Sequence, residues 1–184
     1  TIIDYGLNNL KSIKKVIEKV ERDPNIVAHG SEIDTPDAII LPGIGTFGNG
    51  MEELRSREFI PEIESHLRAN KPMLGICLGM QLLFTGSNEI EYNPGLDIIP
   101  GDVVYFDQPD EIDEESYNIP QVGWNEIYPS KDSTDNPWDD TLLAQTDPGT
   151  DVYFVHSLYP EAVNSEDVLA VCTYGGQTFP AVVQ

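Results

Sequence analysis

The chain has 184 residues, 40% of them hydrophobic, and its 32 acidic and 10 basic side chains give a net charge of −22. This length supports one sizeable hydrophobic core and is short for two, so we expect a single domain over 1–184. A surface this acidic repels phosphate backbones and anionic lipids, which argues against nucleic-acid or membrane binding.

The sequence also bears on the compartment. It contains no run of 18 apolar residues, and its first residues, TIIDYG, do not form a charged-then-apolar leader. We therefore expect a soluble, cytoplasmic protein whose two cysteines, Cys77 and Cys172, are free thiols, although they could pair in principle. We interpret the widely spread acidic residues as an adaptation to a salty cytoplasm; an acidic protein of an ordinary cytoplasm is the alternative.

Short aliphatic runs alternate with helical patterns in the first half of the chain. The runs predict strands at 1–4, 26–28, 38–41 and 72–76. A helical apolar period covers 51–67, and another is formed by Leu10, Ile13, Val16, Ile17 and Val20. The alternation of strands and helices predicts a parallel sheet covered on both faces.

The first predicted helix carries four of the ten basic residues: Lys11, Lys14, Lys15 and Lys19. A solvated helix face accounts for them. A docking edge for a partner protein is the alternative.

A glycine-rich segment, LPGIGTFGNGM at 41–51, follows the third predicted strand. Glycines at a strand end allow backbone N–H groups to turn toward an oxyanion, and each such donor is typically worth about 10²- to 10³-fold in rate. A phosphate-binding loop is the competing interpretation, but the Gly-Lys-Ser/Thr that would complete it does not follow.

The segment KPMLGICLGMQLLF predicts a buried strand, a tight turn that bears Cys77, and an apolar helix from about Leu78. Gly75 and Gly79 allow the unusual backbone angles and the close approach that such a turn requires. A thiol at the carboxyl end of a strand and at a helix N-terminus is expected to have a lowered pKa. We therefore predict a reactive Cys77; a cysteine packed in the core is the alternative.

After about residue 96 the pattern changes to shorter strand-like runs separated by loops rich in Pro, Gly and Asp. The runs lie at 102–106, 124–128, 151–155 and 168–174. Together the two halves predict an α/β fold: an open, mostly parallel sheet with helices on both faces and an antiparallel portion.

Six segments, in this order, resemble the class I (triad) glutamine amidotransferases: DYGLNNLKSIKKVIE, LPGIGTFGNGM, GICLGMQLLF, IPQVGWNEI, VYFVHSLYP and YGGQTFPAVVQ. Within that family they are similar to the HisH group, the glutaminase subunits of imidazole glycerol phosphate synthases. GICLGMQ is typical of the whole family, whereas P-x-x-G-W-N and YFVHS favour the HisH group. The resemblance extends over nearly the whole chain.

The resemblance implies a role for each matching position. Cys77 would be the nucleophile that attacks the glutamine side-chain amide, giving a glutamyl thioester and ammonia. Gly45 and the backbone N–H of Leu78 would form the oxyanion hole. The substrate-binding positions would be Gln81, Glu89, Ser157 and Leu158. Neither a cofactor nor a metal ion is implied.

The resemblance also implies a partner. The stretch 120–125, expected to be a loop, resembles the surface that meets the synthase subunit, with Pro120, Gly123, Trp124 and Asn125 as its matching positions. In the family this partner is HisF, a (β/α)₈ barrel that forms a heterodimer with HisH and uses the ammonia in histidine biosynthesis. We expect Trp124 to anchor that interface, and a core tryptophan is the alternative.

One departure from the family pattern concerns the catalytic base. The family continues beyond the counterpart of FPAVVQ to a His-Pro-Glu motif that completes the triad, whereas this sequence stops at Gln184. We expect His29 and His66 on the surface and His156 in the pocket, with none of them as the base. The chain is thus interpreted as a C-terminally incomplete fragment, inactive by itself; a natural pseudoenzyme is the alternative.

Two further functions stay open from the sequence. A HisH-like protein could supply ammonia to a different synthase, such as one that makes an aminated sugar, and the synthase that copurifies would distinguish it. A non-catalytic binding module would keep the fold without a reactive thiol, and thiol labelling would distinguish that.

Overall fold

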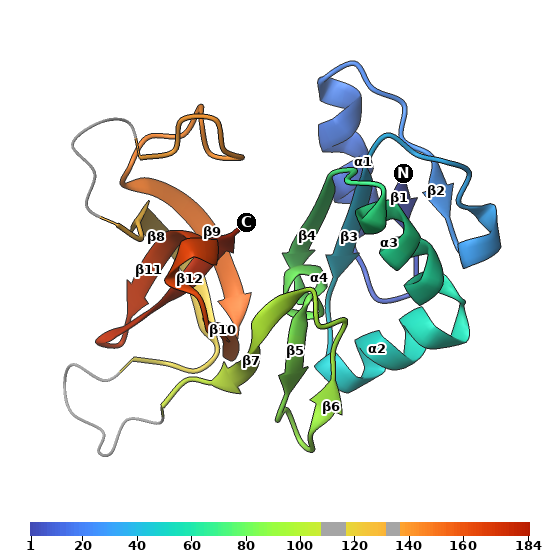
Figure 1. Ribbon diagram of the computed structural model, residues 1–184. Helices are drawn as coiled ribbons and strands as arrows, with labels where there is room; N and C mark the ends of the chain where they lie inside the picture. Colours follow the sequence, from blue (N-terminus) through green and yellow to red (C-terminus); the bar gives the residue numbers. More distant parts are fainter. Residues whose placement is uncertain (108–116, 132–136) are drawn as a thin grey trace. The chain divides into compact units, whose positions relative to one another are not determined.

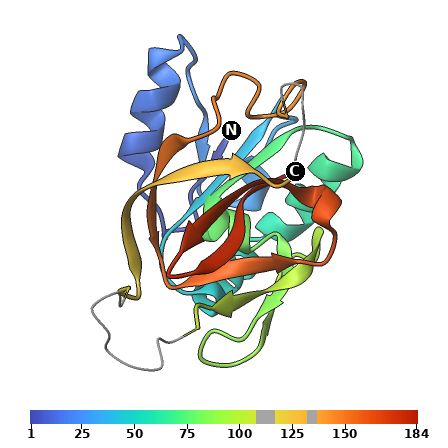
Figure 2. The same cartoon turned by 90° about the vertical axis from the view of Figure 1, so that its left-hand side faces the viewer.

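The computed structural model describes residues 1–107, 117–131 and 137–184 (Figures 1 and 2). The chain divides into two compact units, 1–98 and 99–184, and each is described by itself. The single domain expected from the sequence stays a prediction. Among the described residues, none of the helices is both long and apolar enough to cross a membrane.

The first unit is built on a parallel sheet. Its strands are β1 (Ile2–Ile3), β2 (Ile26–Val27), β3 (Ile39–Gly43) and β4 (Met73–Cys77), which lie in the order β2-β1-β3-β4. The register pairs Ile2 with Ile26 and with Ile40, and it pairs Gly43 with Cys77. All four predicted strands are therefore confirmed, and the last pairing brings the ends of β3 and β4 to the same edge.

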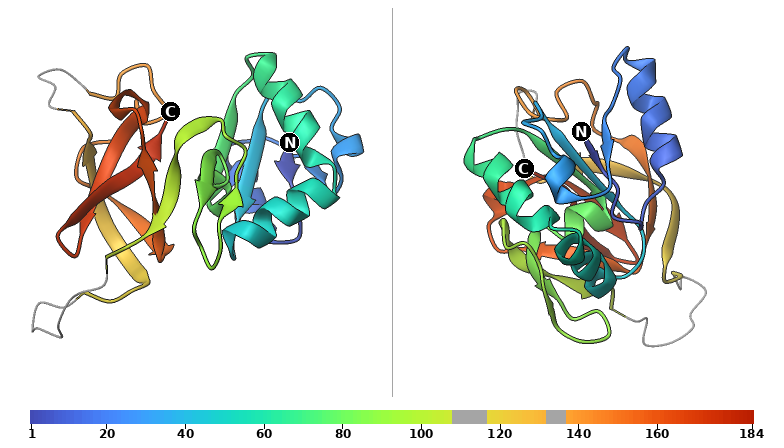
Figure 3. Two further views of the ribbon diagram at one scale, coloured as in Figure 1. Left: turned by 60° about the horizontal axis from the view of Figure 1, so that its bottom comes forward. Right: turned by 90° about the vertical axis from the view of Figure 1, so that its right-hand side faces the viewer.

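Helices lie on both sides of this sheet. They are α1 (Leu10–Lys19), α2 (Phe47–Ser56), α3 (Phe59–Arg68) and α4 (Leu78–Gln81), with a short 3₁₀ turn, η1, at Gly30–Glu32. In the sheet, β2 lies on one side of β1, whereas β4 lies on the opposite side of β3. The two right-handed crossovers, β1 to β2 and β3 to β4, therefore run in opposite directions along the sheet. They place α1 on one face and α2 and α3 on the other (Figure 3). This confirms the α/β class.

The core of the first unit lies between the sheet and these helices. Side chains of β1 and β3 and of α2 and α3 are fully buried there: Ile2, Ile3, Ile39, Leu41, Leu54, Phe59 and Ile63. By contrast, none of the described residues of α1 is buried. Its lysines are exposed or half-exposed, and Lys14 pairs with Glu18 at 3.8 Å, as a solvated helix face would. A docking role for α1 stays a prediction.

The helical segments predicted at 51–67 and after Cys77 are both confirmed, but their lengths differ from the apolar patterns. The apolar stripe at 51–67 belongs to two helices, because Glu58 adopts a left-handed conformation with φ of 58° and ends the run between α2 and α3. The helix expected after Cys77 has only four residues. The apolar residues that follow turn instead into β5 (Phe84–Ser87), which pairs antiparallel with β6 (Asn93–Pro94).

The second unit contains the predicted antiparallel portion. Its strands are β7 (Ile99–Tyr105), β8 (Gln121–Pro129), β9 (Thr150–His156), β10 (Leu158–Ala162), β11 (Val168–Tyr174) and β12 (Gln177–Val183), and a 3₁₀ turn, η2, spans Ser165–Asp167. The order β12-β11-β8-β9 is antiparallel throughout, and β7 pairs antiparallel with β10 (Figure 2). Their core contains Phe106, Ile127, Trp138, Ala170, Cys172 and Phe179.

Candidate functional site

Cys77 lies on a strained turn between β4 and α4. Its φ of 56° and ψ of −119° fall in a region that residues with a Cβ rarely occupy. A Cβ at Gly75 would lie 2.7 Å from the Met80 Cα, and one at Gly79 would collide with the Leu41 carbonyl oxygen. The two glycines therefore provide close approach, as expected, but the unusual backbone angles belong to Cys77 itself.

The electrostatics of the Cys77 thiol differ from the expectation. Cys77 is partly exposed to solvent, yet burial of its sulfur raises the thiol pKa, while the backbone N–H of Leu78 acts in the opposite direction. The expected net lowering of the pKa is wrong, because a helix of four residues has too small a dipole to offset the desolvation of a thiolate. Cys77 and Cys172 are both free thiols, as expected, and Cys172 is only 1% exposed.

The loop after β3 lies at the same sheet edge as Cys77. Gly45 has a φ of 109°, which favours glycine, and no atom lies within 4 Å of the position that a Cβ would take. The N–H of Ile44 donates to the Leu7 carbonyl at 2.9 Å, so the start of this loop is bonded to the segment that follows β1. The backbone of Gly45 thus faces open space close to the strand end that carries the thiol.

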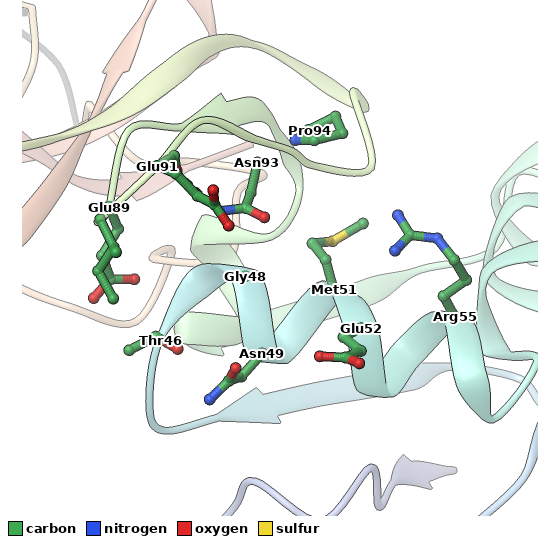
Figure 4. Close-up of a pocket in the computed structure, with 11 residues that line it drawn as sticks. Thr46, Gly48, Asn49, Met51, Glu52, Arg55, Glu89, Glu91, Asn93 and Pro94 are labelled. Atoms are coloured by element: carbon green, nitrogen blue, oxygen red, sulfur yellow. Dashed lines mark hydrogen bonds between the residues drawn. The ribbon is translucent and has the colours of Figure 1, made fainter.

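Glu89 connects this loop to the turn between β5 and β6. The backbone N–H of Phe47, at the start of α2, donates to Glu89 Oε2 at 2.6 Å. Glu89 also borders a cavity of about 360 Å³, a volume at the lower end of the range of about 300–1,000 Å³ for small-molecule pockets. The lining residues are Thr46, Gly48, Asn49, Met51, Glu52, Arg55, Glu89, Ile90, Glu91, Asn93 and Pro94 (Figure 4).

Cys77 does not line this cavity, so the cavity is not by itself the place of reaction. The strained turn presents a nucleophilic atom at Cys77, whereas the cavity residues include no thiol or histidine. Gln81, at the end of α4, is half-buried one helical turn after Cys77. The first unit therefore contains Cys77, Leu78, Gln81, Gly45 and Glu89.

Ser157 and Leu158 belong to the second unit, where they connect β9 to β10. Leu158 is 7% exposed and pairs with Tyr105 on β7. The carbonyl of Ser157 accepts the N–H of Phe106 at 3.2 Å. Their assignment to the substrate pocket stays a prediction.

The three histidines make structural contacts. His29 is half-buried and its Nδ1 accepts the N–H of Ser31 at 3.3 Å, whereas His66 is only 6% exposed and its Nε2 lies 2.9 Å from the Pro72 carbonyl. The surface position expected for His66 is therefore wrong, because the end of α3 packs its ring against the chain entering β4. His156 lies 2.7 Å from the Leu158 carbonyl through Nδ1 and 2.9 Å from Gln121 Oε1 through Nε2, and burial lowers its pKa.

The stretch expected to be a partner-binding loop is mostly strand, since β8 begins at Gln121. Trp124 is 67% exposed, so it is not a core residue, and its ring centroid lies 5.5 Å from that of Tyr153 on β9. Val122 and Val155 form the adjacent exposed pair. Asn125 lies on the opposite face, where its Oδ1 accepts Gln121 Nε2 at 2.8 Å. Val122, Trp124, Tyr153 and Val155 are called the β8–β9 ladder below.

Tyr5 is a buried residue near the site that the sequence did not single out. It is 0% exposed, and its hydroxyl has no hydrogen-bond partner among the described residues. A Cβ at Gly43 would collide with this hydroxyl, which places Tyr5 beneath the strand pair that ends at Cys77. Burial, and next the charge of Cys77, raise the Tyr5 pKa. Within the described residues, no three His, Cys, Asp or Glu side chains gather as metal ligands do.

Comparison with known proteins gives consistent results. The family described as glutamine amidotransferase class-I matches residues 1–182. The chain is 37% identical over 184 residues to imidazole glycerol phosphate synthase subunit HisH 1 of Legionella pneumophila (strain Paris), covering 100% of this chain and 85% of that protein. It is 38% identical over 184 residues to the HisH subunit of Salinibacter ruber, covering 100% of this chain and 81% of that protein.

A solved structure described as a crystal structure of glutamine amidotransferase has the same fold. The superposition has a TM-score of 0.66 and covers 96% of this chain and 86% of that chain. With 11% sequence identity, this likeness concerns the fold alone.

Proposed function

Because the chain belongs to the class I glutamine amidotransferases, which hydrolyse glutamine, we propose that it is the glutaminase subunit of an imidazole glycerol phosphate synthase. In this role it hydrolyses glutamine to glutamate and passes the ammonia to a HisF-type (β/α)₈ subunit for histidine biosynthesis. The observation that carries the proposal is the strained turn that presents Cys77 beside the Gly45 loop, in a chain 37% identical to a HisH subunit.

Each residue of the site has one task in the proposed hydrolysis of glutamine. Cys77 Sγ attacks the amide carbon of glutamine, and the N–H of Leu78 and the backbone at Gly45 stabilise the negative charge that develops on the amide oxygen. The carbon–nitrogen bond then breaks, and ammonia leaves with the proton that the thiol has lost. Water hydrolyses the glutamyl thioester to glutamate and restores the thiol. Gln81 and Glu89 hold the polar groups of the substrate.

The proton acceptor is assigned to none of the described histidines. His66 is buried against the Pro72 carbonyl, and both ring nitrogens of His156 lie within hydrogen-bond distance of neighbouring groups in the second unit. A thiol whose pKa is raised by burial depends on such a base, because little thiolate is present at neutral pH without one.

The β8–β9 ladder supports a protein partner. Its aromatic and aliphatic side chains are 54–67% exposed, and contiguous exposed apolar residues on one sheet face are typical of interaction surfaces.

The test is a glutaminase assay of the protein, expressed from its complete reading frame, with and without a HisF-type subunit. We expect glutamate release that depends on the partner and is abolished by Cys77→Ala. Turnover that is retained by Cys77→Ala, or that occurs only with a synthase of another pathway, would contradict the proposal.

A further inference from the structure

The strongest feature outside the assigned roles is the hydrogen bond between Glu89 and the start of α2. Phe47 is the first residue of α2, and its N–H donates to a carboxylate oxygen 42 positions away. Thr46, at the N-cap position, makes no side-chain capping hydrogen bond within the described residues, and the first turn of α2 contains no acidic residue. Glu89 therefore acts as the cap of α2, from another part of the chain.

This cap is strong for physical reasons. At 2.6 Å it is a charge-assisted hydrogen bond, and a carboxylate at the N-terminus of a ten-residue helix also interacts favourably with the helix dipole. Glu89 is itself held in place: its N–H donates to Ser87 Oγ at 3.1 Å, and its carbonyl accepts the N–H of Glu91 at 2.8 Å. Ser87 is completely buried, so the residue to which the Glu89 backbone is bonded is itself held by packing.

The cap lies two residues after Gly45. A hydrogen bond holds the loop on each side of that glycine: Ile44 N–H to the Leu7 carbonyl before it, and Phe47 N–H to Glu89 after it. Gly45 itself has open space around it and a φ of 109°, so side-chain packing contributes nothing to its orientation. These two hydrogen bonds flank Gly45 and help to fix the direction of its backbone.

We propose that Glu89 is a positioning residue for the oxyanion hole, beyond its role at the substrate. Its Oε2 holds the start of α2 and thereby orients the backbone of Gly45, while the same carboxylate borders the cavity next to the loop (Figure 4). This inference rests on the proposed function. The Glu89 side chain then both contacts the substrate and supports the oxyanion hole.

The test separates positioning from substrate binding by restoring the cap locally. Thr46 has φ of −91° and ψ of 150°, the extended conformation of an N-cap, so Thr46→Asp supplies a carboxylate to the N–H of Gly48 or Asn49 and stabilises the start of α2 without Glu89. Steady-state kinetics in the complex with the synthase subunit would compare Glu89→Ala, Glu89→Ala with Thr46→Asp, and Asn88→Ala. Asn88 is an exposed neighbour in the same turn and is the matched control.

We expect Glu89→Ala to lower kcat by about 10-fold or more, toward the roughly 10²-fold that loss of an oxyanion donor causes. Thr46→Asp is expected to recover most of kcat in that background, while KM stays raised because the substrate contact is still missing. Asn88→Ala should change neither constant. Should Glu89→Ala fail to fold, Glu89→Gln keeps an oxygen acceptor without the charge, and a smaller loss of kcat is expected.

A second measurement does not depend on catalysis. Hydrogen exchange of the Phe47 amide in the free protein should be faster in Glu89→Ala than in the wild type, and it should be unchanged in Asn88→Ala. Unchanged Phe47 exchange, a raised KM with unchanged kcat, or no recovery by Thr46→Asp would overturn the positioning role. A wild-type protein with protected Phe47 but no glutaminase activity would instead overturn the proposed function.

Discussion

Cys77 combines a strained backbone with a thiol that burial makes less acidic. The strain fixes the direction of the side chain, and the close packing of Gly75 and Gly79 against their neighbours helps to maintain φ near 56°. The raised pKa keeps the sulfur protonated at neutral pH, so the thiolate forms when a base removes the proton. Reactivity at this residue is thus conditional on a second group.

Labelling of the two thiols should show both properties. Iodoacetamide is expected to modify Cys77 much faster than Cys172, since Cys172 is 1% exposed. Because burial raises the pKa of the Cys77 thiol, its labelling rate should continue to rise with pH beyond the ordinary cysteine value of about 8.5. Mass spectrometry of folded protein gives the rates, and unfolded protein is the control. Equal rates in the folded protein would contradict the exposed turn.

Tyr5 offers a stability prediction. Its buried hydroxyl has no partner among the described residues, and an unsatisfied buried polar group costs about 1–3 kcal/mol. Tyr5→Phe removes the hydroxyl and keeps the ring, so the free energy of unfolding should increase by about 1 kcal/mol. Thermal unfolding should shift upward by about 2–4 °C. Ile3→Val, a core substitution next to it, is the control and should lower the midpoint; a lower midpoint in Tyr5→Phe would mean that the hydroxyl is bonded in solution.

The sequence allowed the elbow at Cys77 to be predicted, because Gly75, Gly79 and the strand before them act locally. The bond between Glu89 and Phe47 could not be predicted, since it joins residues 42 positions apart and its atoms meet only after β5 and α2 have formed. The burial of Tyr5 depends in the same way on the β3–β4 pairing.

Among the elements, β10 and β12 were not predicted as strands. Pro160 in β10 and Pro180 in β12 interrupt the pattern by which a strand is identified, although both segments pair in the structure. The stripe at 51–67 has a helical period throughout, and Pro61, in the first turn of α3, is the sequence signal for the break at Glu58 that periodicity does not show. Periodicity reports which residues face the core but not where a helix ends.

The β8–β9 ladder leads to a binding prediction. Trp124→Ala should weaken the complex with a HisF-type subunit by about 2 kcal/mol, or about 30-fold, because it removes the largest exposed apolar side chain of the ladder. Calorimetry gives the affinity, and circular dichroism should show an unchanged fold. Val163→Ala is the matched control, since Val163 is 72% exposed but lies outside the ladder. An unchanged affinity for Trp124→Ala would remove the ladder from the interface.

At the scale of the whole molecule, the net charge of −22 is the dominant property. Few of the acidic residues are neutralised within the described part of the chain. Four ion pairs with lysine or arginine occur there. Three of them join residues four positions apart in the sequence, one pair each at α1, α2 and α3. Exposed pairs of this kind contribute little, so most of the acidic side chains repel one another.

Salt should therefore stabilise the protein. The Debye length falls to about 3 Å at 1 M, which screens repulsion between exposed carboxylates. We expect the midpoint of thermal unfolding to rise steeply between dilute buffer and molar KCl, and to rise less when several exposed glutamates are changed to glutamine. A flat midpoint over this range would contradict the interpretation as an adaptation to a salty cytoplasm.

Rapid acid quenching during turnover tests whether Cys77 forms a glutamyl thioester. The protein from its complete reading frame, bound to the synthase subunit, would be mixed with glutamine, quenched and digested for mass spectrometry. We expect a glutamyl adduct on the peptide that contains Cys77, none on the peptide that contains Cys172, and none in Cys77→Ala. Glutamate release without an adduct on Cys77, at a rate that Cys77→Ala retains, would contradict this expectation.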